Sequence, residues 1–497
     1  MPATFIPTPD QQAALDRITS FLDTKSKGTF ILKGYAGTGK TTLVKAILSI
    51  LREKERKYTL LASTGRAAKV MTDAVEKDYS ERGETNAPSA STIHSLIYCF
   101  DKLSQDMDLF SQNRVVQTGH SNEIKLKFSV LKLTDYPGDP MVYIVDESSM
   151  ISDAPDKSLS FAEYGNEGRL LNDLLSYDQK GQFIFIGDNC QLPPVTQPIS
   201  PALSSNYITT TFVISSKESE LTQIVRQAQG NDIVTASALI REKGLNPETE
   251  RFPLSFPLIG YNNVHIVDNE DTLINSYIND IRGQQYSKAT LILLSNKKIS
   301  GLSDIIRPAL GFSTRALSVG DLLLVTQNNL ISGLMNGDLV KVISIGRREL
   351  RAQLTFTHVQ VQSLATEFVY SQFLIEEILY SGSTNITQEQ QTALMIDFHK
   401  RATKKGLKQG QDAYNEMMRK DSYLNALRSI FGYALTCHKA QGGEWDKVYL
   451  EIPRNFYYTS RKYAYQWVYT AMTRAKKDLY ILSDKLLTWS VSGSGLW

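Results

Sequence analysis

A glycine-rich octapeptide near the N-terminus has the residue types and spacing of a phosphate-binding loop. Gly34-Tyr35-Ala36-Gly37-Thr38-Gly39-Lys40-Thr41 matches the pattern GxxxxGK[ST], and it stands between an apolar run and a stretch of helical periodicity. In such a loop the glycines allow a tight turn, so that backbone N–H groups and the helix N-terminus face the phosphates. The lysine neutralises the β- and γ-oxygens, and the hydroxyl of the final threonine suits Mg²⁺. A chance match is the alternative, which both flanks disfavour. The residues predicted to contact ATP here are Gly34, Ala36, Gly37, Thr38, Gly39, Lys40, Thr41 and Thr42.

Two adjacent carboxylates follow a second apolar run. Asp146 and Glu147 come directly after Met141–Val145. With the Thr41 hydroxyl, Asp146 is predicted to hold the magnesium shell, and Glu147 to orient and polarise an attacking water. Acidic pairs at strand ends are common on protein surfaces, but a phosphate-binding loop in the same chain favours the catalytic interpretation.

A rigid polar loop offers a third chemical group. The apolar run Phe183–Ile186 leads into Gly187-Asp188-Asn189-Cys190-Gln191-Leu192-Pro193-Pro194-Val195. Two prolines stiffen this loop, and its position at a strand end predicts that Gln191 is aimed at the γ-phosphate.

The elements that must position these groups are short buried strands alternating with helices. Strands are predicted at Thr29–Lys33, Tyr58–Ala62, Met141–Val145 and Gln182–Ile186, as in a doubly wound α/β domain whose chemistry lies at the strand ends. A second set is predicted at Ala289–Leu294, Gly432–Thr436, Lys447–Glu451 and Leu479–Ser483, with a helix from Tyr463 to Lys476. The second α/β domain is therefore discontinuous.

Segments with a different pattern of apolar and polar residues interrupt both domains. In the first, Ile124–Val130 alternates apolar and polar residues, and with Arg114–Gln117 and the turn-like Thr118–Asn122 it predicts an inserted β-hairpin. In the second, alternating segments between Leu339 and Gln362 predict a small barrel, followed by a polar helical stretch to about Leu427. The basic residues there are Lys400, Arg401, Lys404, Lys405 and Lys408. A solvated helix face is the favoured interpretation of this run, and phosphate contact the other.

Composition narrows the class of protein. The 497 residues carry 54 Lys+Arg and 52 Asp+Glu, a formal charge of +2, so any polyanion site must be a local groove. No apolar run approaches the ~18–20 residues that span a bilayer, and Met1–Thr4 lacks the features of a signal peptide. Three scattered cysteines fit reduced thiols. We therefore expect a cytoplasmic protein that is not bound to a membrane.

Together with Thr436–Glu444 (TCHKAQGGE) and Val468–Ala475 (VYTAMTRA), these motifs resemble the superfamily 1 helicases, specifically the RecD/Dda-like branch, from about Thr8 to Leu482. Several spaced motifs occur in that family's order, which is more specific than a phosphate-binding loop alone. The resemblance implies two RecA-like P-loop NTPase domains in an α/β fold, with an inserted hairpin in the first and a small barrel plus helical insertion in the second.

The resemblance also implies roles for residues at the nucleotide. In Thr8–Ala14, Gln11 would read the adenine edge, although a glutamine-rich helix without a ligand is the alternative. Arg226 and Arg474 resemble the two arginines that reach the γ-phosphate, where a guanidinium provides fork-like donors. Glu444 resembles a ribose contact, and a plain surface carboxylate is nearly as good an interpretation.

Contacts to DNA are implied at five positions. Thr64 and Gly65 follow the second strand, where a hydroxyl and amides at a helix N-terminus suit a phosphate, or where the threonine is simply a helix cap. His94, Thr436 and His438 resemble further strand-contacting positions, though a lone histidine is more often structural. The hairpin lies where relatives carry a duplex-separating wedge, but no motif in Asp101–Gly138 identifies the wedge residue.

The expected organisation follows from these boundaries. Residues 1–98 and 141–215 would form the first RecA-like domain, 99–140 the hairpin, 216–345 and 432–497 the second RecA-like domain, and 346–431 the barrel and helical insertion. The resemblance implies an ATP- and Mg²⁺-dependent helicase moving 5′→3′ on single-stranded or forked DNA in replication, repair or recombination, as a monomer or with a partner protein. Rival interpretations are another P-loop ATPase, a translocase that needs a partner to unwind, and a purely structural protein.

Overall fold

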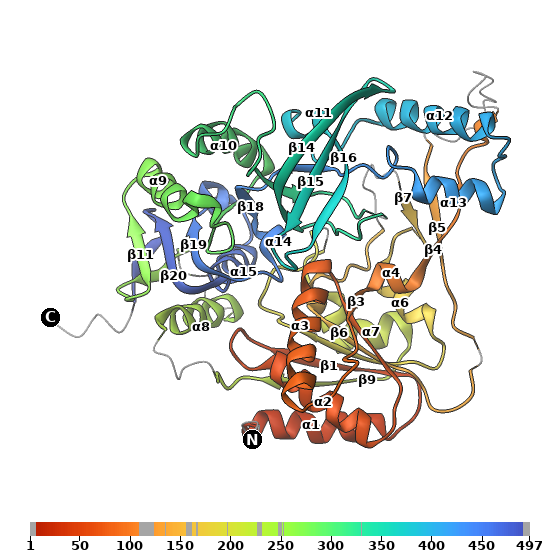
Figure 1. Cartoon of the computed structure of the whole chain (residues 1–497). Coiled ribbons are helices and arrows are strands. Elements are labelled where there is room, and N and C mark those ends of the chain that lie inside the picture. Colours follow the sequence, from red (N-terminus) through yellow and green to blue (C-terminus); the bar gives the residue numbers. More distant parts are fainter. Residues whose placement is uncertain are drawn as a thin grey trace.

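The computed structural model describes residues 6–108, 124–134, 136–155, 162–165, 167–195, 197–225, 231–246, 251, 253–329 and 331–490. Two parallel sheets form the two halves of the protein (Figure 1). None of the described helices is both long and apolar enough to span a bilayer. The mixed α/β fold with two RecA-like domains confirms the predicted fold class.

The first sheet has the strand order β3-β2-β6-β8-β1-β9, and all its pairs are parallel. Its strands are β1 (Gly28–Gly34), β2 (Tyr58–Ala62), β3 (Ser91–Thr92), β6 (Val142–Asp146), β8 (Gln182–Gly187) and β9 (Ser216–Leu221). The strands predicted for this domain are confirmed. The edge strand β9 lies beyond residue 215, the boundary predicted for this domain, because its polar sequence SKESEL lacks the apolar run of the central strands.

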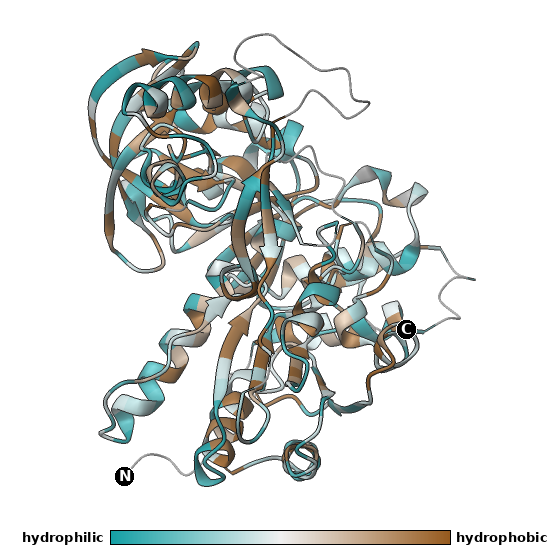
Figure 2. Cartoon of the chain, turned by 90° about the vertical axis from the view of Figure 1, so that its right-hand side faces the viewer, coloured by the Kyte–Doolittle hydropathy of each residue, from teal (hydrophilic) through white to brown (hydrophobic). Residues whose placement is uncertain are grey.

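Helices cover both faces of this sheet. Phe30 and Leu32 of β1 pack with α1 (Pro9–Leu22), α2 (Lys40–Glu53) and α3 (Gly65–Glu81), whereas Ile31 points to the opposite core. That core includes α4 (Ile93–Ile97), α6 (Leu170–Tyr177) and α7 (Ser205–Phe212). Successive strand residues alternate between faces, so the uninterrupted apolar strand β1 is buried on both sides. Figure 2 shows the hydropathy of the residues along the chain.

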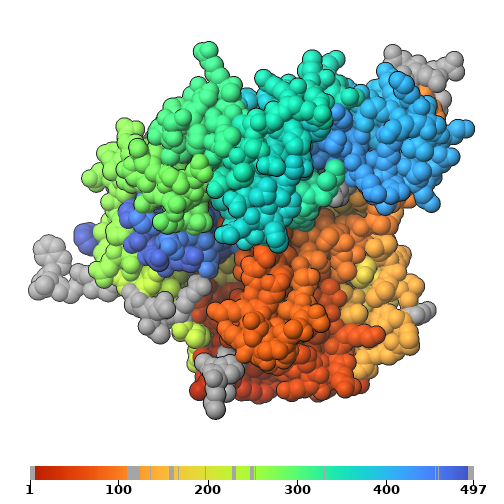
Figure 3. Space-filling model, viewed as in Figure 1, coloured from red at the N-terminus to blue at the C-terminus, as the bar shows by residue number. Residues whose placement is uncertain are grey.

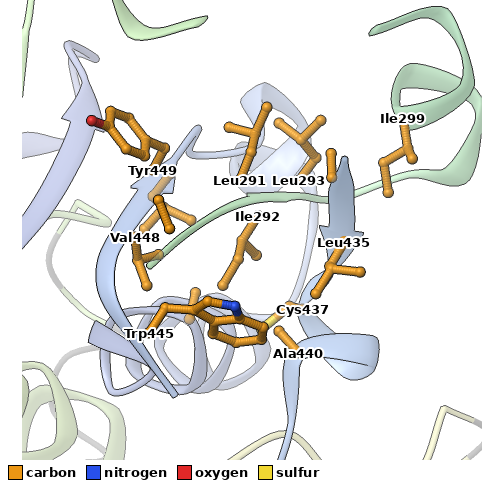
Figure 4. Packing of buried hydrophobic residues seen from close by; sticks show 14 of the residues in the cluster. Leu291, Ile292, Leu293, Ile299, Leu435, Cys437, Ala440, Trp445, Val448 and Tyr449 are labelled. Atoms are coloured by element: carbon orange, nitrogen blue, oxygen red, sulfur yellow. The ribbon is translucent and has the colours of Figure 1, made fainter. Parts of the chain in front are cut away.

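The second sheet has the order β11-β20-β19-β12-β18, again with parallel pairs. Its strands are β11 (Val264–Val267), β12 (Ala289–Leu293), β18 (Ala434–Thr436), β19 (Trp445–Leu450) and β20 (Ala475–Leu482). The helices of this half are α8 (Asp232–Leu245), α9 (Glu270–Ile281), α10 (Asn296–Ala309), α14 (Cys437–Ala440) and α15 (Arg461–Met472). In Figure 4, Leu291 and Leu293 point to one side of β12, while Ile292 points to the side of Trp445.

Short elements complete the two halves. Strands β10 (Phe256–Ile259) and β21 (Leu487–Trp489) form a two-stranded parallel sheet. The described 3₁₀ helices are η1 (Ser148–Met150), η2 (Pro201–Leu203), η5 (Arg282–Gln284) and η6 (Arg454–Tyr458).

An inserted three-stranded sheet branches from the first half. It contains β4 (Tyr98–Leu103), β5 (Leu126–Val130) and β7 (Ala162–Tyr164), with β4 antiparallel to β5. Strand β5 corresponds to the amphipathic segment predicted at Ile124–Val130. The rest of the predicted hairpin, Arg114–Gln117 and its turn, lies outside the described residues.

An antiparallel sheet of order β16-β15-β14-β13-β17 interrupts the second half. Its strands are β13 (Leu322–Val325), β14 (Leu339–Arg351), β15 (Leu354–Ser363), β16 (Val369–Ile375) and β17 (Ser429–Phe431). Leu374 bridges Leu427, just before β17, so the outer strands approach one another as in a small barrel. The sheet begins at Leu322, upstream of the boundary predicted at residue 346, which falls inside β14.

A helical extension follows the barrel strands and returns to the inserted sheet. It consists of α11 (Glu376–Tyr380), α12 (Gln388–Lys404) and α13 (Asp412–Lys420). Leu103, Met107 and Ile124 share a core with α12 and α13 (Figures 1 and 3). In the basic run the four lysines are exposed, and Arg401 forms ion pairs with Asp397 and Asp421.

Candidate nucleotide site and strand-contacting seam

The glycine-rich loop connects β1 to α2, as predicted. Gly37 and Gly39 have φ angles of 82° and 80°, in the left-handed region that glycine adopts most readily. A Cβ atom on Gly34 would lie 2.8 Å from Thr38 Oγ1, so the cradle has no room for a larger residue at its start. Within the described chain, no side chain caps the N-terminus of α2. This geometry fits a phosphate group bound by backbone amides.

Lys40 is folded back onto the start of its own loop. Its Nζ donates hydrogen bonds to the carbonyl oxygens of Gly34, at 2.6 Å, and Tyr35, at 3.0 Å. The ammonium group therefore lies at the β1 end of the cradle, where it is held by neutral acceptors. A phosphate oxygen would provide a stronger, charged acceptor.

Gln11 lies against the same loop. Its side chain is 2% exposed; Nε2 donates to Thr38 O at 2.9 Å, and Oε1 accepts from Thr8 N at 3.0 Å in a capping box. Both ends of the amide therefore contact protein, and Gln11 fixes the loop to α1. The predicted adenine contact would have to use the second N–H of Nε2 or the remaining acceptor site of Oε1.

The neighbouring Asp10 holds the segment that leads toward Arg226. Its Oδ2 accepts hydrogen bonds from Thr222 N, at 2.8 Å, and Gln223 N, at 2.9 Å. Val225 N then donates to Gly37 O at 2.9 Å. Arg226 itself lies outside the described residues, so its predicted γ-phosphate contact stays a prediction.

The two predicted catalytic carboxylates lie at the end of β6, next to the loop. Burial, and then the nearby charge of Glu147, raise the pKa of Asp146 to about 6, while Lys40 acts in the opposite direction. Asp146 Oδ1 accepts from Glu147 N at 2.8 Å. Glu147 adopts a left-handed φ of 49°, and Ser63 Oγ donates to its carbonyl oxygen. The half-buried carboxylate of Asp146 fits a bound cation, which would favour its charged form.

The loop after β8 carries Gln191 into the interface between the two halves. Gln191 is 3% exposed, and its Oε1 has no hydrogen-bond partner in the described part of the chain. Such a buried, unpaired acceptor is costly unless a ligand or water completes it. The unpaired Oε1 fits a donor such as an attacking water, and the contact of Gln191 with the γ-phosphate stays a prediction.

Helix α15 of the second half binds this loop through residues that sequence reasoning missed. Thr470 Oγ1 accepts from Leu192 N at 2.9 Å, and Gln466 Nε2 donates to Gln191 O at 3.2 Å. Tyr469 Oη donates to Asp188 Oδ2 at 2.7 Å and accepts from Ala36 N at 2.9 Å. Positions 466, 469 and 470 lie on one helix face, a spacing that could have indicated a shared interface.

Arg474, at the end of α15, lies in the interior of the second half. It is 5% exposed; Nε donates to Thr470 O at 3.1 Å, Nη1 to Gly443 O at 3.4 Å and Nη2 to Thr473 Oγ1 at 3.2 Å. The described hydrogen bonds thus hold it beside the second domain's own backbone, one helical turn beyond Thr470.

Arg66 of the first half reaches across to the same region. Its guanidinium stacks on the Trp445 ring at 4.3 Å. Burial lowers the pKa of Arg66 to about 10, with Asp338 opposing this shift and Arg474 adding to it. Its Nη1 has no hydrogen-bond partner among the described residues. The sequence analysis did not select Arg66, although it belongs to the motif that supplied Thr64 and Gly65.

Four of the five predicted DNA-contacting residues lie along this seam between the halves. Thr64 caps α3 by accepting from Ala67 N, and Thr436 caps α14 by accepting from Lys439 N. A Cβ atom on Gly442 would lie 3.6 Å from Thr64 Oγ1, and one on Gly65 would overlap Met335. Burial lowers the pKa of His438, and lowers that of Lys439 to about 8. Two helix N-termini from different halves therefore face one seam.

The remaining predicted residues lie elsewhere. His94 contacts the rings of Tyr98 and Tyr164, at centroid distances of 5.5 and 5.3 Å, beside the inserted sheet. Glu444 is exposed in the turn before β19. The structure thus gathers Lys40, Asp146 and Gln191 in the first half, and joins them to α15 of the second.

Comparison with known proteins identifies these two halves. Residues 7–251 match the family described as AAA domain, and residues 431–482 match the UvrD-like helicase C-terminal domain. The chain is a superfamily 1 helicase. This helicase belongs to the RecD/Dda type, as the sequence analysis predicted, and the two matched segments contain the phosphate-binding loop and α15 respectively.

The matches to related proteins cover very different shares of those proteins. This helicase is 22% identical to the ATP-dependent DNA helicase dda of Enterobacteria phage T4, covering 90% of this chain and 93% of that protein. It is 20% identical to the RecBCD enzyme subunit RecD of Buchnera aphidicola, covering 91% and 70%. An uncharacterized protein of Methanocaldococcus jannaschii is 29% identical over 171 residues, where the match covers 33% of this chain and only 11% of that protein.

Among solved structures, the Pif1 helicase from Candida albicans is similar, with 17% identity, 98% coverage of both chains and a TM-score of 0.39. That score is too low for the overall superposition to support further conclusions, so the family assignment depends on the sequence matches and the ordered motifs.

Proposed function

We propose that this chain is an ATP-dependent DNA helicase that moves 5′→3′ on single-stranded DNA and separates duplex DNA in replication, repair or recombination. The observation that carries the proposal is the bonding of α15 to the phosphate-binding loop and to the Gln191 loop. Hydrolysis at such a site would change how the two halves sit against one another. The similar Dda protein is named an ATP-dependent DNA helicase, which supports ATP and DNA as ligands, while the direction is what the resemblance to the RecD/Dda-like branch implies.

The residues of the first half would bind ATP and activate water. Lys40 would leave the Gly34 and Tyr35 carbonyl oxygens for the β- and γ-phosphates, and amides of the loop would bind the remaining oxygens. Asp146 and Thr41 would hold Mg²⁺, which supplies positive charge to the phosphates when bound. Glu147 would orient the attacking water.

The second half would respond to the state of the nucleotide. Arg474, Arg226 and Gln191 would turn toward the γ-phosphate. The phosphate supplies the negative charge that a guanidinium favours, and the attacking water could donate to the unpaired Oε1 of Gln191. Gln11 would contact adenine and Glu444 the ribose. Since α15 makes the bonds to the Gln191 loop and Arg474 follows its C-cap, held to Thr470 O of the same helix, movement at the phosphates would be transmitted to the second half.

Single-stranded DNA would run along the seam defined by Thr64, Gly65, Thr436 and His438. Helix N-termini and the half-buried Lys439, whose pKa of about 8 keeps it largely charged at neutral pH, suit the phosphate backbone of any sequence. His94 would contact the strand near the inserted sheet, which would act as the wedge. We propose that the helicase works as a soluble, intracellular monomer on single-stranded or forked DNA, with or without a replication or recombination partner.

Strand separation on three labelled duplexes tests this function. The substrates carry a 5′ tail, a 3′ tail or no tail, and Lys40→Ala protein is the control. We expect unwinding from the 5′ tail alone, lost in the variant. Unwinding from the 3′ tail alone would contradict the direction but retain the helicase.

A partner-dependent translocase is the second candidate, favoured by the similarity to RecD, which is named as a subunit of a larger enzyme. In that case ATP hydrolysis would be stimulated by DNA and lost in Lys40→Ala, yet the purified chain would separate none of the three duplexes.

A further inference from the structure

The Tyr469 hydroxyl joins three parts of the nucleotide site. It donates to Asp188 Oδ2 at 2.7 Å and accepts from the Ala36 amide at 2.9 Å. Asp188 also accepts from Cys190 N at 2.9 Å. Burial, and then the charge of Asp188, raise the pKa of Tyr469 well above its usual value of 10. The hydroxyl therefore stays protonated, and its one proton is committed to Asp188.

The Ala36 amide lies next to Tyr35, at the end of the loop where the Lys40 ammonium group is held, so it would face the terminal phosphates of a bound nucleotide. Lys40 Nζ lies on the carbonyl oxygens of Gly34 and Tyr35, at the same end of the loop. The lysine of such a loop neutralises β- and γ-oxygens. A backbone amide has one hydrogen, so a phosphate oxygen and the Tyr469 oxygen would compete for it.

The surroundings of Tyr469 allow this exchange without separating the two halves. Thr470 and Gln466, on the same helix, keep their own hydrogen bonds to the loop that contains Asp188. A small cavity beside Tyr469 is also lined by Asn189, Cys190 and Arg241. Loss of the hydrogen bond from Ala36 to Tyr469 would therefore leave α15 attached to this loop.

We propose that Tyr469 is a positioning residue that senses nucleotide occupancy: its hydroxyl holds the Ala36 amide in the empty site and gives it up to a terminal phosphate. Because the same hydroxyl is bonded to Asp188, triphosphate binding is transmitted to the loop that carries Gln191. This inference rests on the proposed function of the loop as an ATP site. It adds a residue that neither the motifs nor the relatives assign to phosphate sensing.

Nucleotide binding in the absence of DNA tests the proposal. The probes are ADP and a non-hydrolysable ATP analogue, and the variant is Tyr469→Phe, which removes only the competing oxygen. We expect the variant to bind the ATP analogue about two- to tenfold more tightly, the range set by one net hydrogen bond. ADP affinity should change less, so the ratio of the two affinities rises. A general loss of stability would shift both affinities together.

A matched control is Tyr465→Phe on the same helix, whose hydroxyl donates to Ser255 O at 3.1 Å within the second half. It should leave both affinities unchanged. Because Tyr469→Phe deprives the buried Asp188 of a donor, the double variant Tyr469→Phe/Asp188→Asn removes that charge as well. It must show the same rise in the affinity ratio, including when the single variant does not fold.

The possible failures are distinguishable. If binding by the wild-type chain is tight and lost in Lys40→Ala, but neither Tyr469 variant changes the affinity ratio, the sensing role is wrong and the ATP site stands. If the variants bind the ATP analogue more weakly, Tyr469 supports the phosphate instead of competing with it, which also overturns the inference. If the wild-type chain binds neither nucleotide, the proposed function fails and this inference fails with it.

Discussion

At the scale of single residues, the site combines buried charge with unpaired polar atoms. Asp146 has a raised pKa, Gln191 Oε1 and Arg66 Nη1 lack partners among the described residues, and Lys40 lies on backbone carbonyl oxygens. The raised pKa of Asp146 and the two unpaired polar atoms cost stability in the ligand-free protein. A bound cation would relieve Asp146, an anion would give Arg66 an acceptor, and a donor such as water would satisfy Gln191 Oε1, so function and stability are opposed at these three side chains.

The substitution Asp146→Asn should stabilise the ligand-free protein, and the size of this effect should depend on pH. The pKa of Asp146 is raised from 3.8 to about 6, so the folded state favours the protonated form. The favourable contribution of this carboxyl group to the free energy of unfolding is complete below pH 3.8 and is lost as the pH rises through about 6. At pH 8 the variant should therefore exceed the wild type in unfolding free energy by on the order of 1–3 kcal/mol, and at pH 3.5 the gain should vanish.

Urea unfolding of nucleotide-free protein at the two pH values measures this difference. Asp139→Asn is the control, because the pKa of this exposed carboxyl is lowered by Lys25 instead. A gain for Asp146→Asn that is equal at both pH values would show that the buried carboxylate is not its source.

At the scale of elements, periodicity and motif order were sufficient to predict the central strands and the phosphate-binding loop. The uninterrupted apolar runs of β1, β6 and β8 predicted a sheet buried on both faces, and the loop before α2 was placed by GxxxxGK[ST] together with the strand and helix predicted on its two sides. The polar edge strand β9 and the start of the barrel sheet at β13 were missed as parts of their sheets, because strand pairing is set by distant partners.

The same limit explains why Gln466, Tyr469 and Thr470 were not selected. Their side chains contact a loop about 280 positions earlier, with separations of 275, 281 and 278 residues. Local sequence shows only that they share a helix face. Gln11 is the opposite case: the motif singled it out, but the structure shows that it also fixes the loop through Thr38 O.

Thr470→Val tests whether the face of α15 couples the two halves. The substitution keeps the shape of the side chain but leaves the buried Leu192 amide without its acceptor, at a cost of about 1–3 kcal/mol. We expect a lower thermal midpoint and a higher KM for ATP. The control, Thr210→Val on α7, removes a hydroxyl bonded to Asn206 O on its own helix. Equal effects of the two substitutions on KM would contradict the coupling role.

At the scale of the whole molecule, the two halves meet in three places. Helix α15 contacts the loop that carries Gln191, the second half lies against Thr64 and Gly65 along the seam, and the inserted sheet contacts the helical extension. The space-filling view shows the barrel strands directly against α3 (Figure 3). A bound strand along the seam would therefore be sensitive to the spacing between the halves.

Gly65→Ala should alter that spacing. A Cβ atom at this position would overlap the Cβ and Cγ atoms of Met335 from the second half, so the variant should bind single-stranded DNA several-fold more weakly. Adding Met335→Gly removes both overlapping atoms and should restore affinity, as measured by fluorescence anisotropy with a labelled oligonucleotide. If the second substitution restores nothing, the loss does not come from this contact between the halves.

The contact between the insertions lies far from the phosphate loop in sequence and depends on Gln409. Its Oε1 accepts from Met107 N at 2.7 Å, and its Nε2 donates to Gln105 O at 2.8 Å, which fixes the helical extension to the inserted sheet. If that sheet is the wedge, Gln409→Leu should lower the rate of duplex unwinding several-fold while ATP hydrolysis on single-stranded DNA stays near that of the wild type. Gln411→Leu is a close control, because Gln411 Oε1 accepts only the local Lys408 amide, at 3.0 Å, among the described contacts. Parallel losses of unwinding and hydrolysis in Gln409→Leu would mean that the contact supports the motor as a whole; a selective loss of unwinding would mean that it holds the wedge against the force of translocation.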